Sequence, residues 1–393
     1  MIGALLKKER LSQNMSQETL CHGICATSYL SKIETGAAKG TTELLGELFH
    51  VLNVTYVTDP TALETLDALY KASFTALRQT DDLPKTDPEA VALCHQLRFS
   101  PRGVDACLLC ALYDPNQRAS LQFNREQLTS EQNLLYAYVK CLYYRSIGED
   151  QQATALLQTV KTTNEGWVYS ILAEIYFRIG DYTAAIVEAE HGYQVCATQG
   201  NIQGMLDCAM HAGSCYANTQ GSERMQYWYS IAKNINHTTK NISLNYTLEY
   251  NMGATLLMYG KAEQSIAYFL RAEVAHKHDK VDKDLLYQKM IYALLRVGRP
   301  EEAAQRMPLI TVIDTPLVLL LAYMLEHPDF MHNKEYCALL EACVQTAKKR
   351  RFRGMMDFYS YFLVEAYIST KQYKKAIKHA NEFKFSFDIP LFD

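Results

Sequence analysis

The chain has 393 residues, of which 48% are hydrophobic and 21% are charged, and its formal net charge is −4. This composition is ordinary for a globular protein that buries a large core, and the length predicts two or three domains. The charge excludes a protein that attracts nucleic acid with its whole surface, so any contact with nucleic acid must be local.

The N-terminal segment predicts a bundle of short helices. The first helix is expected at residues 2–13, and the closing helix at Thr42–Leu52. In the first helix, leucines at helical spacing are expected to face the core, and basic residues are expected to face outward. The expected core residues are Leu5, Leu6 and Leu11, and the expected outward residues are Lys7, Lys8 and Arg10.

Between these two helices, Ser16–Gly36 predicts two short helices joined by a tight turn at Gly23. The serine at the start of this stretch suits an N-cap, and the glycine at its end suits the position after a helix. The second helix places Leu30 and Ile33 on one apolar face and leaves small polar and basic residues outward. This is the arrangement by which a helix-turn-helix offers one helix to the major groove of DNA.

The stretch resembles the helix-turn-helix of the phage-repressor-like (Xre/Cro) family over about residues 1–56. The matching residues are Arg10, Ser16-Gln17-Glu18-x-Leu20, Tyr29-Leu30-Ser31-Lys32-Ile33-Glu34-x-Gly36, and Leu44, Leu48, Leu52 and Val54 in the closing helix. The resemblance implies a double-stranded DNA operator as a partner. Gln17 is expected at a phosphate, and the other expected DNA-binding residues are Thr27, Ser28, Tyr29 and Lys32.

Residues 1–56 contain five basic and five acidic residues, so this segment has no net charge. Most DNA-binding modules gain affinity from a basic surface. One copy is therefore expected to bind DNA weakly, and a homodimer is expected to bind two half-sites together. The alternative is a helical bundle that has lost DNA binding and serves only for dimerisation.

A long helix is predicted at Thr61–Gln79, because apolar residues recur there at steps of three and four. It could connect the small N-terminal domain to the rest of the chain, form a dimer contact, or be the first helix of the next domain. A connecting helix that also packs is favoured. Pro84 and Pro88 then interrupt the helical pattern. The expected domains are a helix-turn-helix domain at 1–58, a connecting helix and linker at 59–88, and a repeat domain at 89–393.

From about residue 90 the sequence predicts helix after helix, and glycines mark a repeat. Repeat units end their first helices at Gly148, Gly180, Gly260 and Gly298; a weaker unit contains Gly213-x-x-Tyr216, and a last one contains Leu363-x-x-x-Tyr367 and Tyr373. These units resemble the tetratricopeptide repeat, in which small residues allow helices to cross closely and aromatic residues fill the gaps. The expected small residues are Ala173, Gly213 and Gly253, and the expected aromatic residues are Tyr176, Tyr216 and Phe269. The predicted fold is all-α, with the bundle followed by a right-handed tetratricopeptide-like α-solenoid.

The sequence contains none of the common motifs for nucleotide binding, zinc-dependent hydrolysis or a nucleophile elbow, so neither an enzyme nor a cofactor is expected. Cys107 and Cys110 lie in an apolar run, which predicts a buried helix face rather than a zinc site. The eleven scattered cysteines predict a reducing cytoplasm. No membrane contact is expected, because the most apolar run, Leu317–Leu325, is much shorter than a span of ~20 residues.

A helix-turn-helix followed by tetratricopeptide-like repeats resembles the RRNPP family of peptide-pheromone regulators of Gram-positive bacteria, and its PlcR-type members in particular. The run from Ile24 to Gly36 and the order of the domains both fit. The resemblance implies a cytoplasmic homodimer whose repeat domain binds a short linear signalling peptide in quorum sensing and thereby changes DNA binding. Two alternatives are a prophage-type repressor that binds a protein antagonist and a scaffold that does not bind DNA.

In tetratricopeptide repeats, the first helix of each unit lines the concave face, and the glycine positions indicate which residues point inward. Amide side chains can satisfy the backbone groups of an extended peptide, and a guanidinium can bind a carboxylate. Asn251 and Gln288 are therefore expected at the peptide backbone, and Arg178 or Arg296 at an acidic group. The other expected peptide-binding residues are Tyr250 and Tyr292, for apolar side chains, and Asn218 in the weaker unit.

Overall fold

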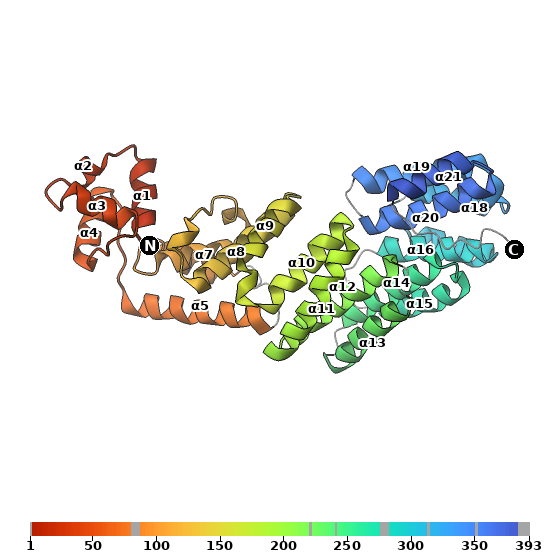
Figure 1. Ribbon diagram of the computed structural model, residues 1–393, viewed down its shortest axis with the longest axis horizontal. Helices are drawn as coiled ribbons and strands as arrows, with labels where there is room; N and C mark the ends of the chain where they lie inside the picture. The colour runs from red at the N-terminus through yellow and green to blue at the C-terminus, as the bar shows by residue number, and fades with distance from the viewer. Residues whose placement is uncertain are drawn as a thin grey trace. The chain divides into compact units, whose positions relative to one another are not determined.

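The structure is a computed structural model, and it describes residues 2–79, 87–219, 222–239, 242–275, 283–312, 315–349 and 353–383. These residues form helices and turns, and no strand occurs among them (Figure 1). The chain divides into two compact units. The first contains Met1–Val168 and Val195–Gly204, and the second contains Tyr169–Gln194 and Met205–Asp393. The predicted all-α fold class is confirmed.

The first unit begins with the predicted bundle of short helices. These are α1 (Ile2–Ser12), α2 (Gln17–Cys21), α3 (Thr27–Glu34) and α4 (Thr42–Val51). The side chain of Ser16 caps α2 by accepting a hydrogen bond from the Thr19 N–H. Gly23 and Gly36 have positive φ angles of 77° and 78°, as the turns after α2 and α3 require. Leu30 and Ile33 are buried in the bundle core.

Two expectations for α1 are wrong. Arg10 is only 6% exposed, because its guanidinium forms a bidentate ion pair with Glu34 across the bundle. Leu11 is 54% exposed, because it lines an open cavity instead of the bundle core. The expectations for the other α1 residues hold, since Leu5 and Leu6 are buried and Lys7 and Lys8 are exposed.

The first unit continues with helices that pack in sequence order against their neighbours. They are α5 (Pro60–Gln79), α6 (Pro88–Gln96), α7 (Gly103–Tyr113), α8 (Ser130–Ser146) and α9 (Asp150–Val160). The apolar face of α5 is buried against α6 and α7, so this connecting helix is also part of the packed unit. Asp87 caps α6 at the predicted break before Pro88, whereas the break predicted at Pro84 lies outside the described residues.

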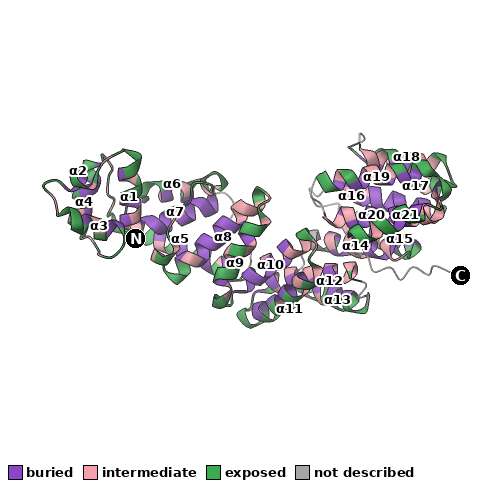
Figure 2. Ribbon diagram, turned by 45° about the horizontal axis from the view of Figure 1, so that its top comes forward, coloured by how far each residue is buried: buried purple, intermediate pink, exposed green. Residues whose placement is uncertain are grey.

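The second unit contains most of the remaining helices, whereas α10 (Gly166–Ile179), α11 (Tyr182–Gln199) and α12 (Ile202–Asn218) each have residues in both units. The helices that follow are α13 (Ser222–Thr239), α14 (Ile242–Met258), α15 (Ala262–Ala275), α16 (Lys283–Arg296), α17 (Pro300–Arg306), α18 (Pro316–Glu326), α19 (Lys334–Lys349), α20 (Arg353–Ser369) and α21 (Tyr373–Phe383). Buried residues lie mainly along the sides of helices that face their neighbours (Figure 2).

The glycines that marked the repeats all occupy the same structural position. Gly148, Gly180, Gly260 and Gly298 each follow the first helix of a pair and have φ angles of 77°, 84°, 71° and 73°. At Gly260 its N–H bonds to the Leu257 carbonyl, and the next N–H bonds to the Leu256 carbonyl. This is the Schellman helix terminus, which needs a left-handed residue. In the last repeat Lys371 occupies this position, with a φ of 60°. The glycine pattern in the sequence therefore does not mark this repeat.

Close helix crossings explain two further glycines. A Cβ at Gly253 would lie 2.7 Å from the Phe269 ring, as the predicted pairing of small and aromatic residues requires. A Cβ at Gly213 would lie 2.6 Å from the Tyr229 ring. The predicted gap-filling residue Tyr216 instead directs its hydroxyl to Glu190. Helix α12 therefore packs on α13 through Tyr229.

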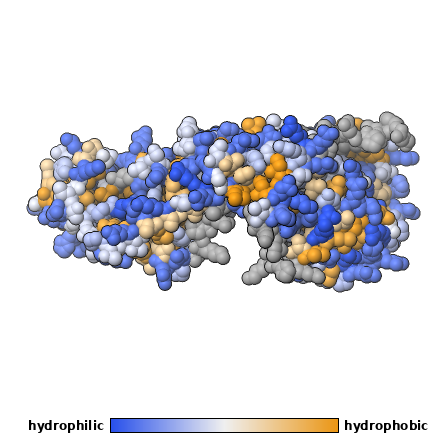
Figure 3. All heavy atoms as spheres, turned by 90° about the horizontal axis from the view of Figure 1, so that it is seen from below, coloured by the Kyte–Doolittle hydropathy of each residue, from blue (hydrophilic) through white to orange (hydrophobic). Residues whose placement is uncertain are grey.

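Apolar side chains also reach the surface of the protein. On the face drawn in Figure 3, they form separate groups among hydrophilic side chains. Within the described ranges, no helix combines the length and the apolar character that crossing a bilayer requires.

Candidate functional sites

Helix α3 presents most of the predicted DNA-binding residues to solvent. Thr27, Ser28, Tyr29 and Lys32 are all exposed. The Tyr29 hydroxyl donates to the Lys39 carbonyl at 3.0 Å, which fixes the direction of this ring. Within the described part of the chain, the side chains of Ser28 and Lys32 make no hydrogen bond or ion pair. These two side chains are therefore available for contact with a partner.

Gln17, which is expected at a phosphate, also makes a contact within the bundle. Its side-chain amide donates to Glu34 Oε2 at 2.7 Å, and the same carboxylate accepts from Arg10 Nη2 at 2.9 Å. Arg10 also donates to the Met15 carbonyl at 2.7 Å. The amide of Gln17 thus joins the start of α2 to the end of α3 inside the bundle. One sequence signal pointed to this network, since Arg10 follows the buried Leu6 by one helical turn.

The predicted peptide-binding residues lie on first helices of the second unit, and they fall into two groups. Arg178, Asn218, Tyr250 and Asn251 are half-buried on α10, α12 and α14. Asn218 donates its side-chain N–H to the Ser214 carbonyl at 2.7 Å, which holds it against its own helix. The three predicted residues of α16 are more enclosed, because α20 packs against α14 and its side chains contact Tyr292 and Arg296.

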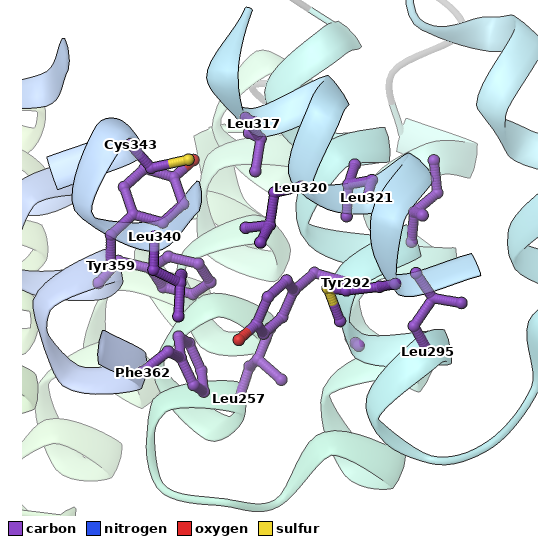
Figure 4. Packing of buried hydrophobic residues seen from close by; sticks show 14 of the residues in the cluster. Leu257, Tyr292, Leu295, Leu317, Leu320, Leu321, Leu340, Cys343, Tyr359 and Phe362 are labelled. Atoms are coloured by element: carbon purple, nitrogen blue, oxygen red, sulfur yellow. The ribbon is translucent and has the colours of Figure 1, made fainter. Parts of the chain in front are cut away.

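Two of the α16 residues serve the core of the second unit. Tyr292 is 1% exposed, its hydroxyl bonds to the Tyr336 hydroxyl, and its ring centroid lies 4.8 Å from that of Phe362 (Figure 4). Arg296 binds both carboxylate oxygens of Glu365, at 2.9 and 2.7 Å. The place of α16 as the first helix of its unit predicts that it is open to the concave face, but helix α20 of the last repeat covers these positions.

Lys289, which the sequence analysis did not select, has the most unusual environment on α16. It is 7% exposed, and its Nζ lies 4.9 Å from the centre of the Tyr250 ring and 4.3 Å from that of Phe358. Among the described residues it has no carboxylate partner, and burial lowers the pKa of Lys289 to about 7. A buried ammonium without a counter-ion is costly, so this position is suited to an anionic group of a ligand.

Gln288 lies beside Lys289 and is also buried. It lines a cavity of about 160 Å³ together with Tyr359 and Thr346. Gln288 and Lys289 are neighbours in sequence on α16, and Lys289 contacts α14 through Tyr250 and α20 through Phe358. A sequence signal for both existed, because they are the only strongly polar residues in the apolar run 285–295.

Helix α20 is fixed over this region by a second buried polar cluster. The Tyr182 hydroxyl donates to Asp357, and Arg353 pairs with the same carboxylate at 2.9 Å. Burial raises the pKa of Asp357 above its ordinary value, although Arg353 acts in the opposite direction. The cluster links the start of α11 to the start of α20 within the second unit.

No protein-family model matches the chain. The chain is 21% identical over 370 residues to the transcriptional activator NprA of Geobacillus stearothermophilus, covering 88% of this chain and 81% of that protein. Its fold is similar to that of a Rap protein in complex with Competence and Sporulation Factor, with a TM-score of 0.60, 12% identity, and coverage of 82% of this chain and 97% of that one. It is also similar to the apo form of the quorum sensor NprR from B. thuringiensis, with a TM-score of 0.57, 15% identity, and coverage of 82% and 98%. The predicted resemblance to RRNPP-type proteins with tetratricopeptide-like repeats is thus confirmed in fold and over most of the chain.

Proposed function

We propose that this protein is a cytoplasmic DNA-binding transcriptional regulator, and not an enzyme, whose repeat domain binds a short linear signalling peptide. One observation carries the proposal: the buried ammonium of Lys289 has no carboxylate partner among the described residues, which suits a ligand with a negative charge. The exposed polar face of α3, which suits an operator, supports it. The names of the sequence relative, a transcriptional activator, and of the similarly folded quorum sensor support both halves.

The peptide would bind at the inner side of the first helices of the second unit. Asn251 and Gln288 offer amide groups for its backbone, and the Tyr250 ring offers apolar contact. Lys289 supports a peptide that carries a carboxylate, either at an acidic side chain or at its C-terminus. Tyr292 and Arg296 would hold the site from behind, through the core contacts described above.

The peptide would alter DNA binding only if it bound two arrangements of the chain with different affinities. We place DNA binding in residues 1–58, the connecting helix and linker in 59–88, and peptide binding and dimerisation in 89–393. A homodimer would supply two copies of α3, which offsets the absence of net positive charge in the bundle.

The experiment is fluorescence anisotropy with labelled DNA that flanks the gene, in the presence and absence of synthetic peptides from short reading frames nearby. We expect a specific complex, a change in affinity with one peptide, and at least about tenfold weaker binding for Lys32→Ala. Lys374→Ala, an exposed lysine of α21, is the matched control and should bind as the wild type does. Equal affinity for specific and unrelated DNA, or no loss with Lys32→Ala, would contradict the proposal.

A further inference from the structure

A cavity of about 860 Å³ lies within the first unit, away from both surfaces considered so far. Helices α1 and α3 of the bundle form one wall, and α6, α7 and residues 117–127 form the other. Its volume lies in the range of about 300–1,000 Å³ that small-molecule sites occupy in proteins.

The two walls are held together at several points around this cavity. The Val57 N–H donates to the Phe99 carbonyl at 2.8 Å, and the Phe49 and Phe99 ring centroids lie 5.3 Å apart. On another side, the side-chain amide of Gln127 donates to the Thr35 carbonyl. The two walls are therefore joined by hydrogen bonds and ring packing within one unit, and the cavity is open between them.

The charges that line the cavity are predominantly positive. Lys7, Lys8 and Arg98 all line it, and none of them forms an ion pair with a described residue. The Lys8 ammonium reaches only the Ser120 carbonyl, at 3.4 Å, and the Arg98 guanidinium lies over the Phe99 ring at 5.3 Å. Of the described residues in the lining, one carries a carboxylate, and this residue, Glu34, pairs with Arg10.

The rest of the lining is apolar or neutral. Leu11 and Phe123 contribute apolar surface, which accounts for the exposure of Leu11 on a helix that otherwise buries its leucines. Cys94 and Cys107 also line the cavity, and burial raises the pKa of these thiols to about 12 and about 11. They are neutral at physiological pH, and no group of three or more described His, Cys, Asp or Glu residues could hold a metal ion.

We propose that this cavity is a second ligand site, which binds a small organic anion with an apolar body. The anionic head would lie among Lys7, Lys8 and Arg98, and the body would contact Leu11 and Phe123. None of the residues expected to bind DNA or the peptide lines this cavity. The inference does not depend on the proposed function, since it concerns binding to the first unit alone.

Occupancy of this site would act on the end of the DNA-facing helix. Thr35 directly follows α3 and lines the cavity, and its carbonyl is the group that Gln127 binds. A ligand that contacts both walls therefore favours one setting of α3 relative to the first repeat helices. By linkage, such a ligand and the partner of α3 alter each other's affinity.

The probe is anilinonaphthalene sulfonate, a fluorescent organic anion with an apolar body, titrated into the full chain. We expect saturable binding that Lys8→Glu combined with Arg98→Glu weakens by at least about tenfold. The matched control combines Lys374→Glu with Lys378→Glu, which makes the same change of charge on exposed lysines of α21 and should leave affinity unaltered. Leu11→Glu, at an exposed position, should weaken binding without unfolding the bundle.

Two further measurements distinguish the contribution of the anionic head to binding from that of the apolar body. N-phenylnaphthylamine, which lacks the anion, should bind at least about tenfold more weakly. Decanoate should displace the probe, whereas inorganic phosphate at the same concentration should not. Equal affinity of the wild type and the charge-reversed cavity variant, with unchanged circular dichroism, would overturn the proposal, as would equally tight binding of the neutral analogue. Failure of DNA binding in the separate anisotropy experiment would leave this result standing.

Discussion

Arg10 in the first unit and Lys289 in the second are both buried basic residues, but their surroundings are opposite. Arg10 forms two charge-assisted hydrogen bonds with Glu34, and Gln17 completes the network. Lys289 contacts two aromatic rings and, within the described ranges, has no anionic partner. A satisfied buried charge fixes one arrangement of the chain, whereas an unsatisfied one is a cost that a ligand can remove. The first is therefore a structural feature and the second a candidate binding feature.

The largest expected effect comes from breaking the satisfied network. Glu34→Ala leaves the Arg10 guanidinium buried without a partner, which should lower the free energy of unfolding of the bundle by about 3–5 kcal/mol. Hydrogen exchange of the α1–α4 amides, read by mass spectrometry, measures this loss. Arg10→Met combined with Glu34→Leu removes both charges and should recover most of the stability. If the single variant exchanged as slowly as the wild type, Arg10 would not depend on its partner.

The opposite result is expected for the unsatisfied charge. Lys289→Met should raise the free energy of unfolding of the unliganded protein by about 1–4 kcal/mol, because an apolar side chain of similar length replaces an unpaired cation. Urea denaturation at neutral pH measures this gain. The control is Lys374→Met, which is exposed and should change stability by less than about 0.5 kcal/mol. A clear loss of stability in Lys289→Met would show that a partner already stabilises this ammonium.

The pH dependence of the free energy of unfolding, compared between the wild type and Lys289→Met, tests the same point. The folded pKa of Lys289 is about 7, below the value in an unfolded chain, so above about pH 7 the unfolded state binds a proton that the folded state does not. The wild type should therefore gain stability relative to Lys289→Met, by up to ~1.4 kcal/mol per pH unit, as the pH rises from about 7 to 8. Comparing the two proteins cancels the shared contributions of cysteine and tyrosine residues. A constant difference over this range would mean that Lys289 stays charged in the fold.

The sequence predicts features that depend on nearby residues better than features that depend on residues far away in the chain. The turn glycines and the exposed face of α3 follow from local rules of helix termini and helical spacing, and the structure has both. The burial of Lys289 and Tyr292 depends on α20, which comes more than sixty residues later in the chain. Periodicity within one helix contains no information about which distant helix covers it. Arg10 was misplaced for the same reason, since its partner Glu34 lies on another helix.

A smaller effect should appear at the residue beside Lys289. Gln288→Ala removes an amide that would bind the peptide backbone in a desolvated groove, which should weaken peptide binding by about 1–3 kcal/mol. Titration calorimetry with the cognate peptide measures the change. Asn251→Ala should show a loss of similar size, whereas Gln264→Ala, on the exposed side of α15, should show none. Unchanged affinity in both Gln288→Ala and Asn251→Ala would remove this face of the repeats as the peptide site.

The smallest expected effect distinguishes the two roles that Gln17 can have. If its amide chiefly holds Glu34, Gln17→Ala should lower the stability of the bundle by about 1 kcal/mol, because the carboxylate keeps its bonds to Arg10. DNA affinity, measured where the bundle is fully folded, should then change by less than about twofold. Lys32→Ala should show the converse, with unchanged hydrogen exchange and weaker DNA binding. If instead Gln17→Ala weakened DNA binding as strongly as Lys32→Ala with no loss of stability, Gln17 would release Glu34 on binding DNA and contact a phosphate. The Arg10–Glu34 pair alone would then be the fixed part of the network.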